Sequence, residues 1–345
     1  MRRWLIAGAM TIAGAAGLGT AAGASADTPT TTTPATTTTT TTPVTTPTGP
    51  PPPAKGSLKL SLRDVFTLGH TQVTIPHRKV QVEGTARPYV SRQRVTMSVY
   101  LGKRRLHTYR LRIRPAKGGK YGTVSYPIRV SGAGKVRVVV KHAATPQLRA
   151  FSAHESFQTL NPRAGFGSRS DFVRLIQQRL VALHFYLPQT GVYDSGTGLA
   201  MDAYHRLMRW GTYQTLDGRT VNALLDGHGS FKVRYPSHGR HAEGNLSDQL
   251  LALINGSHVY WIFPISSGKP STPTILGHFH VYSRVPGYLP DGMYYSDFFF
   301  RGYAIHGYNP APDYPASHGC MRLPIVDAIS AFNWLAIGDA VDVYY

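Results

Sequence analysis

Short runs in which apolar and polar residues alternate fill the chain from Ser57 to Leu160. In a strand, successive side chains point to opposite faces, so such a run buries one face and exposes the other. Turn residues separate the runs, which are Val73–Ile75, Lys79–Glu83, Val95–Tyr100, Thr108–Arg114, Val124–Ile128 and Val136–Val140. The pattern predicts an antiparallel β-sandwich of the immunoglobulin-like kind over residues 57–160.

The period changes to that of helices between residues 165 and 230. Ser170 is a suitable N-cap, and four apolar residues then fall on one helix face: Val173, Ile176, Leu180 and Leu183. Loops rich in Gly and Asp precede two further expected helices, Thr197–Trp210 and Thr220–Leu225. The runs V-R-L-I-Q-Q-R-L, G-V-Y-D-S-G-T and L-D-G-R-T-V-N-A-L-L resemble the small three-helix peptidoglycan-binding domain. The resemblance implies contact with the cell wall, and a plain spacer is the alternative.

Residues 238–345 have the pattern of a small β-rich domain. Gly and Pro separate its strand-like runs, which are Gln249–Ile254, Val259–Phe263, His278–Tyr282 and Tyr303–His306. One helix is expected over Pro324–Ile337, with Pro at its first position and Gly338 after its end. A last strand, Ala340–Tyr345, completes the sheet. The chain is therefore expected to contain several domains.

The first residues predict export. Met1–Arg3 is basic, Trp4–Gly19 is apolar, and Ala24–Ala26 has the small-x-small pattern of a cleavage site, so residues 1–26 are typical of a signal peptide. Thr and Pro dominate residues 27–56, which predicts an extended linker. The protein is expected in the cell wall or outside the cell, or in the periplasm if the cell has an outer membrane. Membrane association is expected only if the signal segment is retained.

The positive charge of the chain is concentrated in the expected β-sandwich. Between Lys55 and Arg163 there are 22 Lys or Arg and 3 Asp or Glu, a net +19 of the chain's +20. In Tyr109–Arg114 every second residue is Arg, so one strand face is basic. This face favours contact with an anionic wall polymer, and the alternative is an ordinary solvated strand face. Nucleic acid is set aside because the chain carries an export signal and lacks interleaved aromatic residues.

Cys320 is the single cysteine, which excludes an internal disulfide, a CxxC metal site and an iron–sulfur site. It lies in Ser317–Arg322, with His306–Gly307 upstream. A thiol of ordinary pKa is only ~3% thiolate at pH 7. An imidazolium that lowered this pKa to ~6.5 would raise the thiolate fraction about 25-fold, and lower nucleophilicity would remove about 6–10-fold of that gain. A histidine that carries the proton and backbone donors at the oxyanion contribute more, so the residues point to acyl transfer through a thioester.

Ala304–Gly307 followed by Ser317–Arg322 resembles the catalytic domain of the L,D-transpeptidase (YkuD) family. Three further stretches support the resemblance: F-P-I-S-S-G-K from Phe263, T-P-T-I-L-G-H-F from Thr272, and Met293–Tyr295 before Phe299. The matching residues cover about the last third of the chain. The resemblance implies a β-rich catalytic domain over residues 238–345.

The resemblance also implies roles for individual residues. Cys320 would be the nucleophile, and His306 the general base and acid, with its ring oriented by the Gly307 carbonyl. His318, Gly319 and Cys320 would surround the oxyanion with backbone N–H groups. The candidate substrate contacts are Arg322, which could pair with a carboxylate, and Ser317, Tyr295 and Met293. For Met293 and Tyr295, as for Tyr282, a place in the core is the more common alternative.

The implied reaction remodels peptidoglycan. Cys320 would attack the carbonyl between the third residue of a donor stem tetrapeptide, usually a diamino acid, and its terminal D-Ala. A side-chain amine of an acceptor stem would then take the acyl group and form a 3→3 cross-link. Water as the acceptor would make the protein an L,D-carboxypeptidase. Two rival hypotheses are a non-catalytic wall-binding protein and a binder of anionic polymers.

No metal or other cofactor is required by this reaction. His278 and His280 stand at strand spacing and are conceivable metal ligands. The sequence contains neither an HExxH motif nor a second cysteine beside them, so we predict no metal site.

Overall fold

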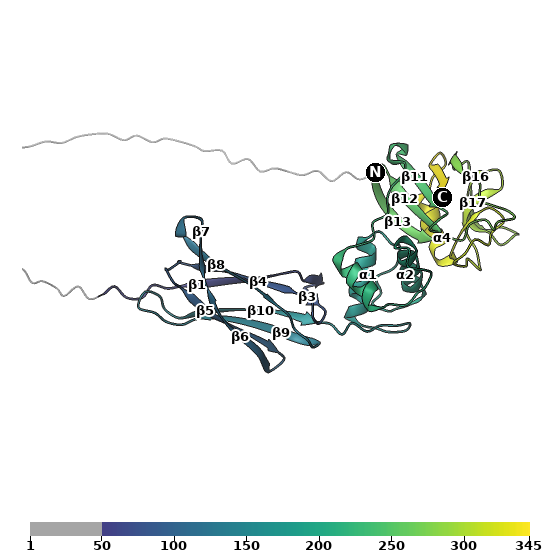
Figure 1. Cartoon of the computed structure of the whole chain (residues 1–345). Coiled ribbons are helices and arrows are strands. Elements are labelled where there is room, and N and C mark those ends of the chain that lie inside the picture. The colour runs from purple at the N-terminus through teal and green to yellow at the C-terminus, as the bar shows by residue number, and fades with distance from the viewer. Residues whose placement is uncertain (1–49) are drawn as a thin grey trace, which may run out of the picture. The chain divides into compact units, whose positions relative to one another are not determined.

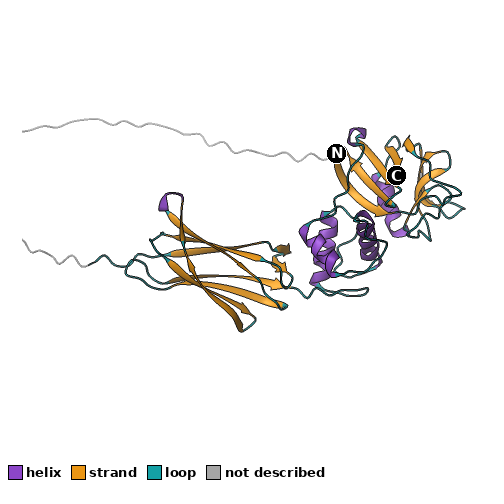
Figure 2. Ribbon diagram, viewed as in Figure 1, coloured by secondary structure: helices purple, strands orange, loops and turns teal. Residues whose placement is uncertain are grey.

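The computed structural model describes residues 50–345 (Figure 1). The expected signal peptide, residues 1–26, and most of the expected linker, residues 27–56, lie outside the described residues. The described part of the chain is mostly β-sheet with four α-helices (Figure 2). None of the helices in residues 50–345 is both long and apolar enough to cross a membrane.

Ten strands between Ser57 and Thr159 form two sheets around one core. The four-stranded sheet has the order β1 (Ser57–Arg63), β4 (Val80–Arg87), β8 (Tyr121–Ile128) and β7 (Arg114–Ala116). The six-stranded sheet has the order β2 (Phe66–Leu68), β3 (Thr71–Thr74), β10 (Phe151–Thr159), β9 (Gly134–His142), β5 (Arg94–Leu101) and β6 (Arg104–Arg112). Alternate residues of both sheets, such as Val82 and Val138, are buried in the shared core. The expected all-antiparallel pairing is wrong in one place, because β3 pairs with β10 in parallel.

Three helices follow in the segment that has helical periodicity: α1 (Asp171–Ala182), α2 (Ser195–Leu207) and α3 (Gly218–Asp226). Ser170, Asp194 and Asp217 cap them, and each side chain accepts a hydrogen bond from the backbone N–H three residues further on. The sequence expectation for the second helix is shifted, since α2 begins at Ser195 and ends at Leu207. The Asp194 cap sets this beginning, because its carboxylate satisfies the N–H of Thr197.

The remaining strands form two further sheets. The five-stranded sheet has the order β13 (His258–Pro264), β12 (Leu250–Asn255), β11 (Arg240–Asn245), β19 (Ala340–Tyr344) and β14 (Gly277–His280). The four-stranded sheet has the order β15 (Ser283–Tyr288), β16 (Tyr294–Phe300), β17 (Tyr303–Gly307) and β18 (Met321–Leu323). Helix α4 (Ile325–Trp334) packs on β16 and β17. It ends before the expected Ile337, because Leu335 has extended backbone angles.

Strand β12 is buried on both faces. Leu251 and Leu253 point into the core shared with β17 and β18, while Leu250, Ala252 and Ile254 point into a core shared with the helices α1–α3. This double burial explains the unbroken apolar run L-L-A-L-I, which shows no alternation. The helices therefore cover one face of the sheet from which the C-terminal domain is built.

Candidate functional site

His306 and Cys320 lie on two paired strands. Strand β17 pairs with β18 in parallel, with His306 opposite Arg322 and Ile305 opposite Met321. Cys320 immediately precedes β18, in the bend that leads into this strand. Ile305 and Met321 point to the opposite face and are buried in the core. The fold thus brings the segments that carry His306 and Cys320 together on one pair of strands.

His306 is almost fully buried, with 2% of its surface exposed. Its Nδ1 lies 2.9 Å from the carbonyl oxygen of Gly307, which is the contact that the family resemblance implied. A carbonyl only accepts, so Nδ1 carries the proton and the lone pair of Nε2 is left to accept another. Burial lowers the pKa of His306 from 6.5 to about 4, and the Gly307 bond opposes this only in part. The imidazole is therefore neutral at pH 7 and can act as a base.

Cys320 is partly buried and is a free thiol. Its Sγ lies 3.5 Å from the carbonyl oxygen of Gly302, to which it can donate. Burial raises the pKa of Cys320, and the backbone of Ala304 and the charge of Arg322 lower it less. The structure therefore favours a neutral thiol beside a neutral imidazole. An imidazolium, which would lower the thiol pKa, is not what this environment favours.

Two charges act on both groups. Burial is the largest cause of both pKa shifts. As smaller causes, the charge of Arg322 lowers the pKa of both His306 and Cys320, and the charge of Asp291 raises both. The two groups therefore respond to the same charged neighbours. The Arg322 guanidinium lies 4.0 Å from the centre of the Tyr308 ring. Arg322 is partly exposed, so its positive charge is available to pair with an anionic group.

The segment from Ser317 to Cys320 is a loop held by its own hydrogen bonds. Ser317 is fully buried, and its hydroxyl donates to the carbonyl of Cys320 over 2.6 Å and accepts from the N–H of Gly319 over 3.0 Å. These bonds occupy the hydroxyl, so Ser317 holds the loop that carries Cys320 in place, and the hydroxyl is not free for the expected substrate contact. The Gly319 N–H can donate to an oxyanion only if its hydrogen bond to the Ser317 hydroxyl breaks.

Glycine is the residue type that fits best at position 319. Its φ is +125°, a region that side chains rarely adopt. A Cβ at Gly319 would lie 2.4 Å from the Tyr303 ring. The close approach of this ring explains why a glycine precedes the cysteine.

His318 is exposed and lies beside Lys269. The Lys269 ammonium is 3.3 Å from Nε2 of His318. An ammonium has only donors, so Nε2 accepts and the ring proton sits on Nδ1. The ring braces the outside of the loop, while the backbone N–H of His318 remains a candidate oxyanion donor.

The expected contacts of Met293 and Tyr295 with substrate find no support in their packing. Met293 is buried. The centre of the Tyr295 ring lies 5.0 Å from the centre of the Phe332 ring on α4. A Cβ at Gly307 would touch Ala328 of α4, so α4 covers the face of β17 opposite to His306. These contacts indicate that Met293 and Tyr295 contribute to the packing of the domain.

Sequence reasoning missed three residues that shape the site. Asp291 acts on both reactive groups from the turn between β15 and β16, and nothing in its sequence context marks it. Lys269 and Ser267 stand in the segment that braces the loop: Ser317 donates its N–H to the Ser267 carbonyl, and the Lys269 N–H binds the Ser317 carbonyl, both over 2.9 Å. The run F-P-I-S-S-G-K was the signal for this segment, although it did not reveal its role.

Comparison with known proteins identifies this domain. Residues 239–343 match the family of the L,D-transpeptidase catalytic domain, YkuD. The chain is similar to the solved L,D-transpeptidase from Xylanimonas cellulosilytica DSM 15894, with 30% identity over 53% of this chain and 100% of that chain, at a TM-score of 0.48. It is also similar to the L,D-transpeptidase (Yku) from Stackebrandtia nassauensis, with 17% identity, 54% and 97% coverage and a TM-score of 0.34. For the catalytic domain of the Enterococcus faecium enzyme the identity is 25%, the coverage is 31% and 98%, and the TM-score is 0.28. No curated protein matches the chain.

The family match over residues 239–343 identifies the C-terminal domain as that of an enzyme, a transpeptidase. The chain belongs to the L,D-transpeptidase family. The match confirms the resemblance stated from His306–Gly307 and Ser317–Arg322. It does not extend to the helical segment, whose likeness to a peptidoglycan-binding domain stays a prediction.

Proposed function

We propose that this protein is an exported L,D-transpeptidase that remodels peptidoglycan stem peptides through a thioester on Cys320. The observation that supports the proposal most strongly is a buried, neutral imidazole, with Nδ1 bound to the Gly307 carbonyl, on the strand that pairs with the one directly after the only thiol of the chain. This arrangement leaves Nε2 of His306 free to take the thiol proton.

The first half of the proposed reaction forms the acyl-enzyme. As Sγ of Cys320 attacks the carbonyl before the terminal D-Ala, its proton passes to Nε2 of His306. The carbonyl electrons move to the oxygen, which the backbone N–H groups of His318 and Cys320 stabilise. The carbonyl then reforms, the bond to D-Ala breaks, and His306 returns the proton to the leaving amine. Proton transfer contributes ~10²–10⁴-fold and an oxyanion donor ~10²–10³-fold to the rate of such a reaction.

The second half transfers the acyl group. An acceptor amine attacks the thioester, gives its proton to His306, and forms the new amide, while the Cys320 thiol is regenerated. Water in place of the amine gives hydrolysis, which is the carboxypeptidase alternative. No metal or redox cofactor takes part in either half.

A carbapenem provides a direct test of the nucleophile, because its strained amide acylates activated nucleophiles. The purified protein, treated with a carbapenem, is expected to gain the mass of one adduct. We expect no adduct on Cys320→Ala and strongly slowed formation on His306→Ala, while His154→Ala, which removes an exposed imidazole of the β-sandwich, reacts normally. An adduct that persists on Cys320→Ala would contradict the proposed nucleophile.

The acceptor is identified by the products from a stem tetrapeptide. A 3→3 cross-linked dimer together with D-Ala indicates a transpeptidase, whereas a tripeptide and D-Ala alone indicate an L,D-carboxypeptidase. Absence of both products with a folded protein would favour a non-catalytic wall-binding role. Mass spectrometry of the reaction mixture separates the three outcomes.

The proposed export rests on residues 1–26. A chain recovered outside the cytoplasm is expected to begin after Ala26, and the mass of its N-terminal peptide measures this. A chain that keeps Met1 and stays in the cytoplasm contradicts export, and one that keeps Met1 in the membrane indicates a retained anchor.

We propose as a second activity that the basic β-sandwich binds an anionic wall polymer. A groove of about 580 Å³ lies between β6, β7 and β8. Its lining includes the three alternate arginines of this segment and, on β8, two hydroxyl-bearing residues: Arg110, Arg112, Arg114, Thr123 and Ser125. Arginines and hydroxyls are donors suited to phosphate oxygens, so the groove suits a phosphate-containing chain.

Retention on an immobilised poly(glycerol phosphate) measures this binding. We expect salt-sensitive retention that is lost when Arg110, Arg112 and Arg114 are changed to Gln. A matched variant with Lys55, Lys59 and Lys135 changed to Gln removes the same charge elsewhere in the segment and is expected to retain binding. Equal loss in both variants would mean general attraction to a basic protein rather than a site.

A further inference from the structure

A row of ionisable side chains crosses three adjacent strands of the five-stranded sheet. Glu243 of β11 stands opposite Asp342 of β19, and Asp342 stands opposite His278 of β14. The 3₁₀ turn Pro236–His238 lies over this row and adds the imidazole of His238. The hydrophobic neighbours in β19, Val341 and Val343, point to the opposite face and into the core. The row is separate from Cys320, which precedes β18 of the other sheet.

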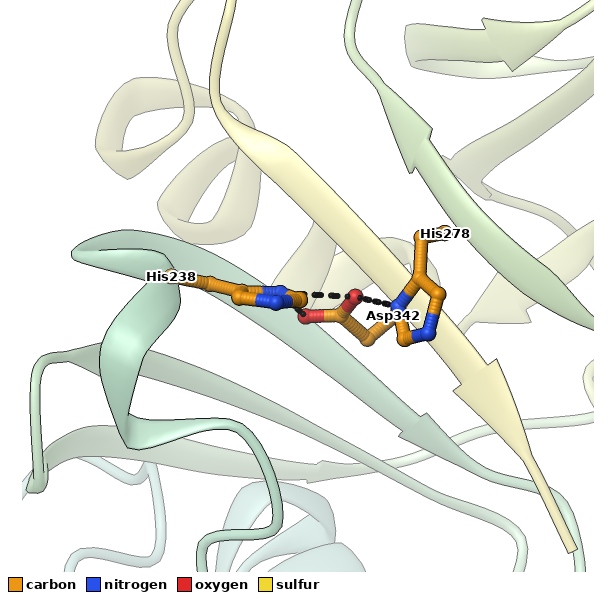
Figure 3. Close-up of side chains that lie close together, drawn as sticks. All are labelled: His238, His278 and Asp342. Carbon is orange, nitrogen blue, oxygen red and sulfur yellow. Dashed lines mark hydrogen bonds and ion pairs between the residues drawn. The ribbon is translucent and has the colours of Figure 1, made fainter.

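Asp342 is fully buried, and two imidazoles hold its carboxylate (Figure 3). Nδ1 of His278 lies 2.6 Å from Oδ1, and Nδ1 of His238 lies 3.1 Å from Oδ1 and 3.0 Å from Oδ2. Among the described residues, no Lys or Arg forms an ion pair with Asp342. A buried carboxylate is stabilised by a neighbouring positive charge, which a bound metal ion would supply.

We propose that His238, His278 and Asp342 bind a divalent transition-metal ion, with Zn²⁺ as the ion that this ligand set suits best. Their three ligand atoms lie within 4.8 Å of one another. Ligands at 2.0–2.1 Å around a tetrahedral zinc stand roughly 3.3 Å apart. The observed N···O separations are therefore close to those of a metal site. Small rotations of the His238 and His278 imidazoles would open the space for the ion.

The chemistry of the donors selects the metal. Two imidazole nitrogens and one carboxylate suit zinc, whereas Mg²⁺ and Ca²⁺ prefer oxygen ligands only. Each imidazole would bind the ion through Nδ1, with its ring proton on Nε2. The His278 side chain is 56% exposed and that of His238 is 32% exposed, so the ion has an entry path and a fourth position for water.

The neighbouring ionisable residues are already bound elsewhere. Glu243 accepts hydrogen bonds from the N–H groups of Arg234 and Tyr235 and from the Tyr344 hydroxyl. His241 uses Nδ1 on the Gly239 carbonyl and Nε2 on Glu243. These bonds leave His238, His278 and Asp342 as the three groups that share a site.

The proposed ion would join the segment that precedes β11 to the middle of the sheet. His238 belongs to the turn that follows the helices, and Asp342 and His278 belong to β19 and β14. The ion would fix this turn in place, which is a stabilising role and needs no contact with the reacting groups. The inference is thus independent of the proposed function at Cys320.

Zinc titration of the full chain tests the site. The protein is prepared without a histidine tag, stripped with a chelator, and carries Cys320→Ala so that the thiol cannot bind zinc. Calorimetry is expected to show one ion per chain. His278→Ala, which alters a largely exposed side chain, is expected to weaken binding by about 10–100-fold or more. His280→Ala removes an exposed imidazole from the same strand and is expected to leave the affinity unchanged.

Asp342→Asn provides a second variant, and its folding is checked by circular dichroism. Cobalt in place of zinc gives an independent readout, because tetrahedral Co²⁺ absorbs visible light strongly and its spectrum is expected to vanish in His238→Ala. Two results would overturn the proposal: no stoichiometric binding to the stripped protein, or equal weakening by His278→Ala and His280→Ala. Either would mean that the three residues form only a hydrogen-bonded group.

Discussion

At the scale of single residues, burial has the largest effect on the pKa values of His306 and Cys320. The pKa of His306 is lowered to about 4, and that of Cys320 is raised. The sequence brought these two residues to attention by their types and neighbours. It could not predict the direction of either pKa shift, because the directions depend on which side chains the fold packs around them.

The lowered His306 pKa predicts an unusual pH profile. A base with a pKa of about 4 instead of 6.5 stays neutral as the pH falls through 6.5 and becomes protonated only near 4. We therefore expect the rate of acylation by a carbapenem to stay nearly constant from pH 8 to below pH 6 and to fall as the pH approaches 4. A decline centred on pH 6.5 would show that His306 has an ordinary pKa. Stopped-flow absorbance across this range measures the profile.

The raised Cys320 pKa predicts slow alkylation at neutral pH. Iodoacetamide reacts with the thiolate, so its rate on Cys320 is expected to be below that of a free thiol at pH 7 and to rise only in alkaline solution. Acylation by a carbapenem is expected to be much less affected, because His306 removes the proton during attack. A faster reaction of iodoacetamide with Cys320 than with glutathione would indicate a thiolate and contradict the neutral pair.

Gly319 provides a prediction for a single substitution. Gly319→Ala places a Cβ against the Tyr303 ring at a φ of +125°, so the nucleophile loop has to move. A displacement of about 1 Å lowers rates by ~10²-fold, which is the loss of acylation rate that we expect. The variant Gly302→Ala is a matched control, because a Cβ there meets open space. Equal activity of Gly319→Ala and the native chain would show that the loop does not need this glycine.

At the scale of elements, the apolar patterns were informative and the polar ones were not. The expected runs Val95–Tyr100 and Val259–Phe263 coincide closely with β5 and β13, and Ser170 caps α1 as predicted. Strand β11 was missed, because R-H-A-E-G-N contains charged residues that normally stay in water. In the structure His241 and Glu243 are fully buried, since the segment before β11 covers them and supplies hydrogen bonds. Such compensation comes from residues that no local pattern connects.

The buried pair Asp202–Arg206 links helix α2 to the C-terminal domain. Arg206 is 2.5 Å from Asp202 and also donates to the carbonyls of Gln249 and Ile265. Gln249 in turn binds Ser267, whose carbonyl holds the Ser317 loop. We expect Arg206→Met to destabilise the fold by about 3–5 kcal/mol, since it leaves Asp202 buried without a partner.

The double variant Asp202→Asn, Arg206→Met separates the two contributions of this link. Removing both charges is expected to recover part of the stability that Arg206→Met loses, as measured by thermal unfolding. Acylation by a carbapenem is expected to be slower than in the native chain, because the contacts of Arg206 with Gln249 and Ile265 remain lost. Recovery of full activity along with stability would show that Arg206 serves only to neutralise Asp202.

At the scale of the whole molecule, the sequence predicted the position of the catalytic domain. The catalytic domain was expected over residues 238–345 and the family match covers 239–343. The pairing of strands far apart in the chain was beyond the sequence. Asp342 lies 64 residues from His278 and 104 from His238, so the group they form could not be recognised before the sheet was known. For the same reason the sequence predicted no metal site.

The two apolar faces of β12 determine where the chain can be divided. Family similarity alone suggests a boundary near residue 239, yet cutting there would strip the helices from Leu250, Ala252, Ile254 and Ile262 and expose a broad apolar surface to water. A portable piece that contains the catalytic domain therefore has to include the helices. In a gene fusion or a recombination event, the helices and the enzyme would have to travel together.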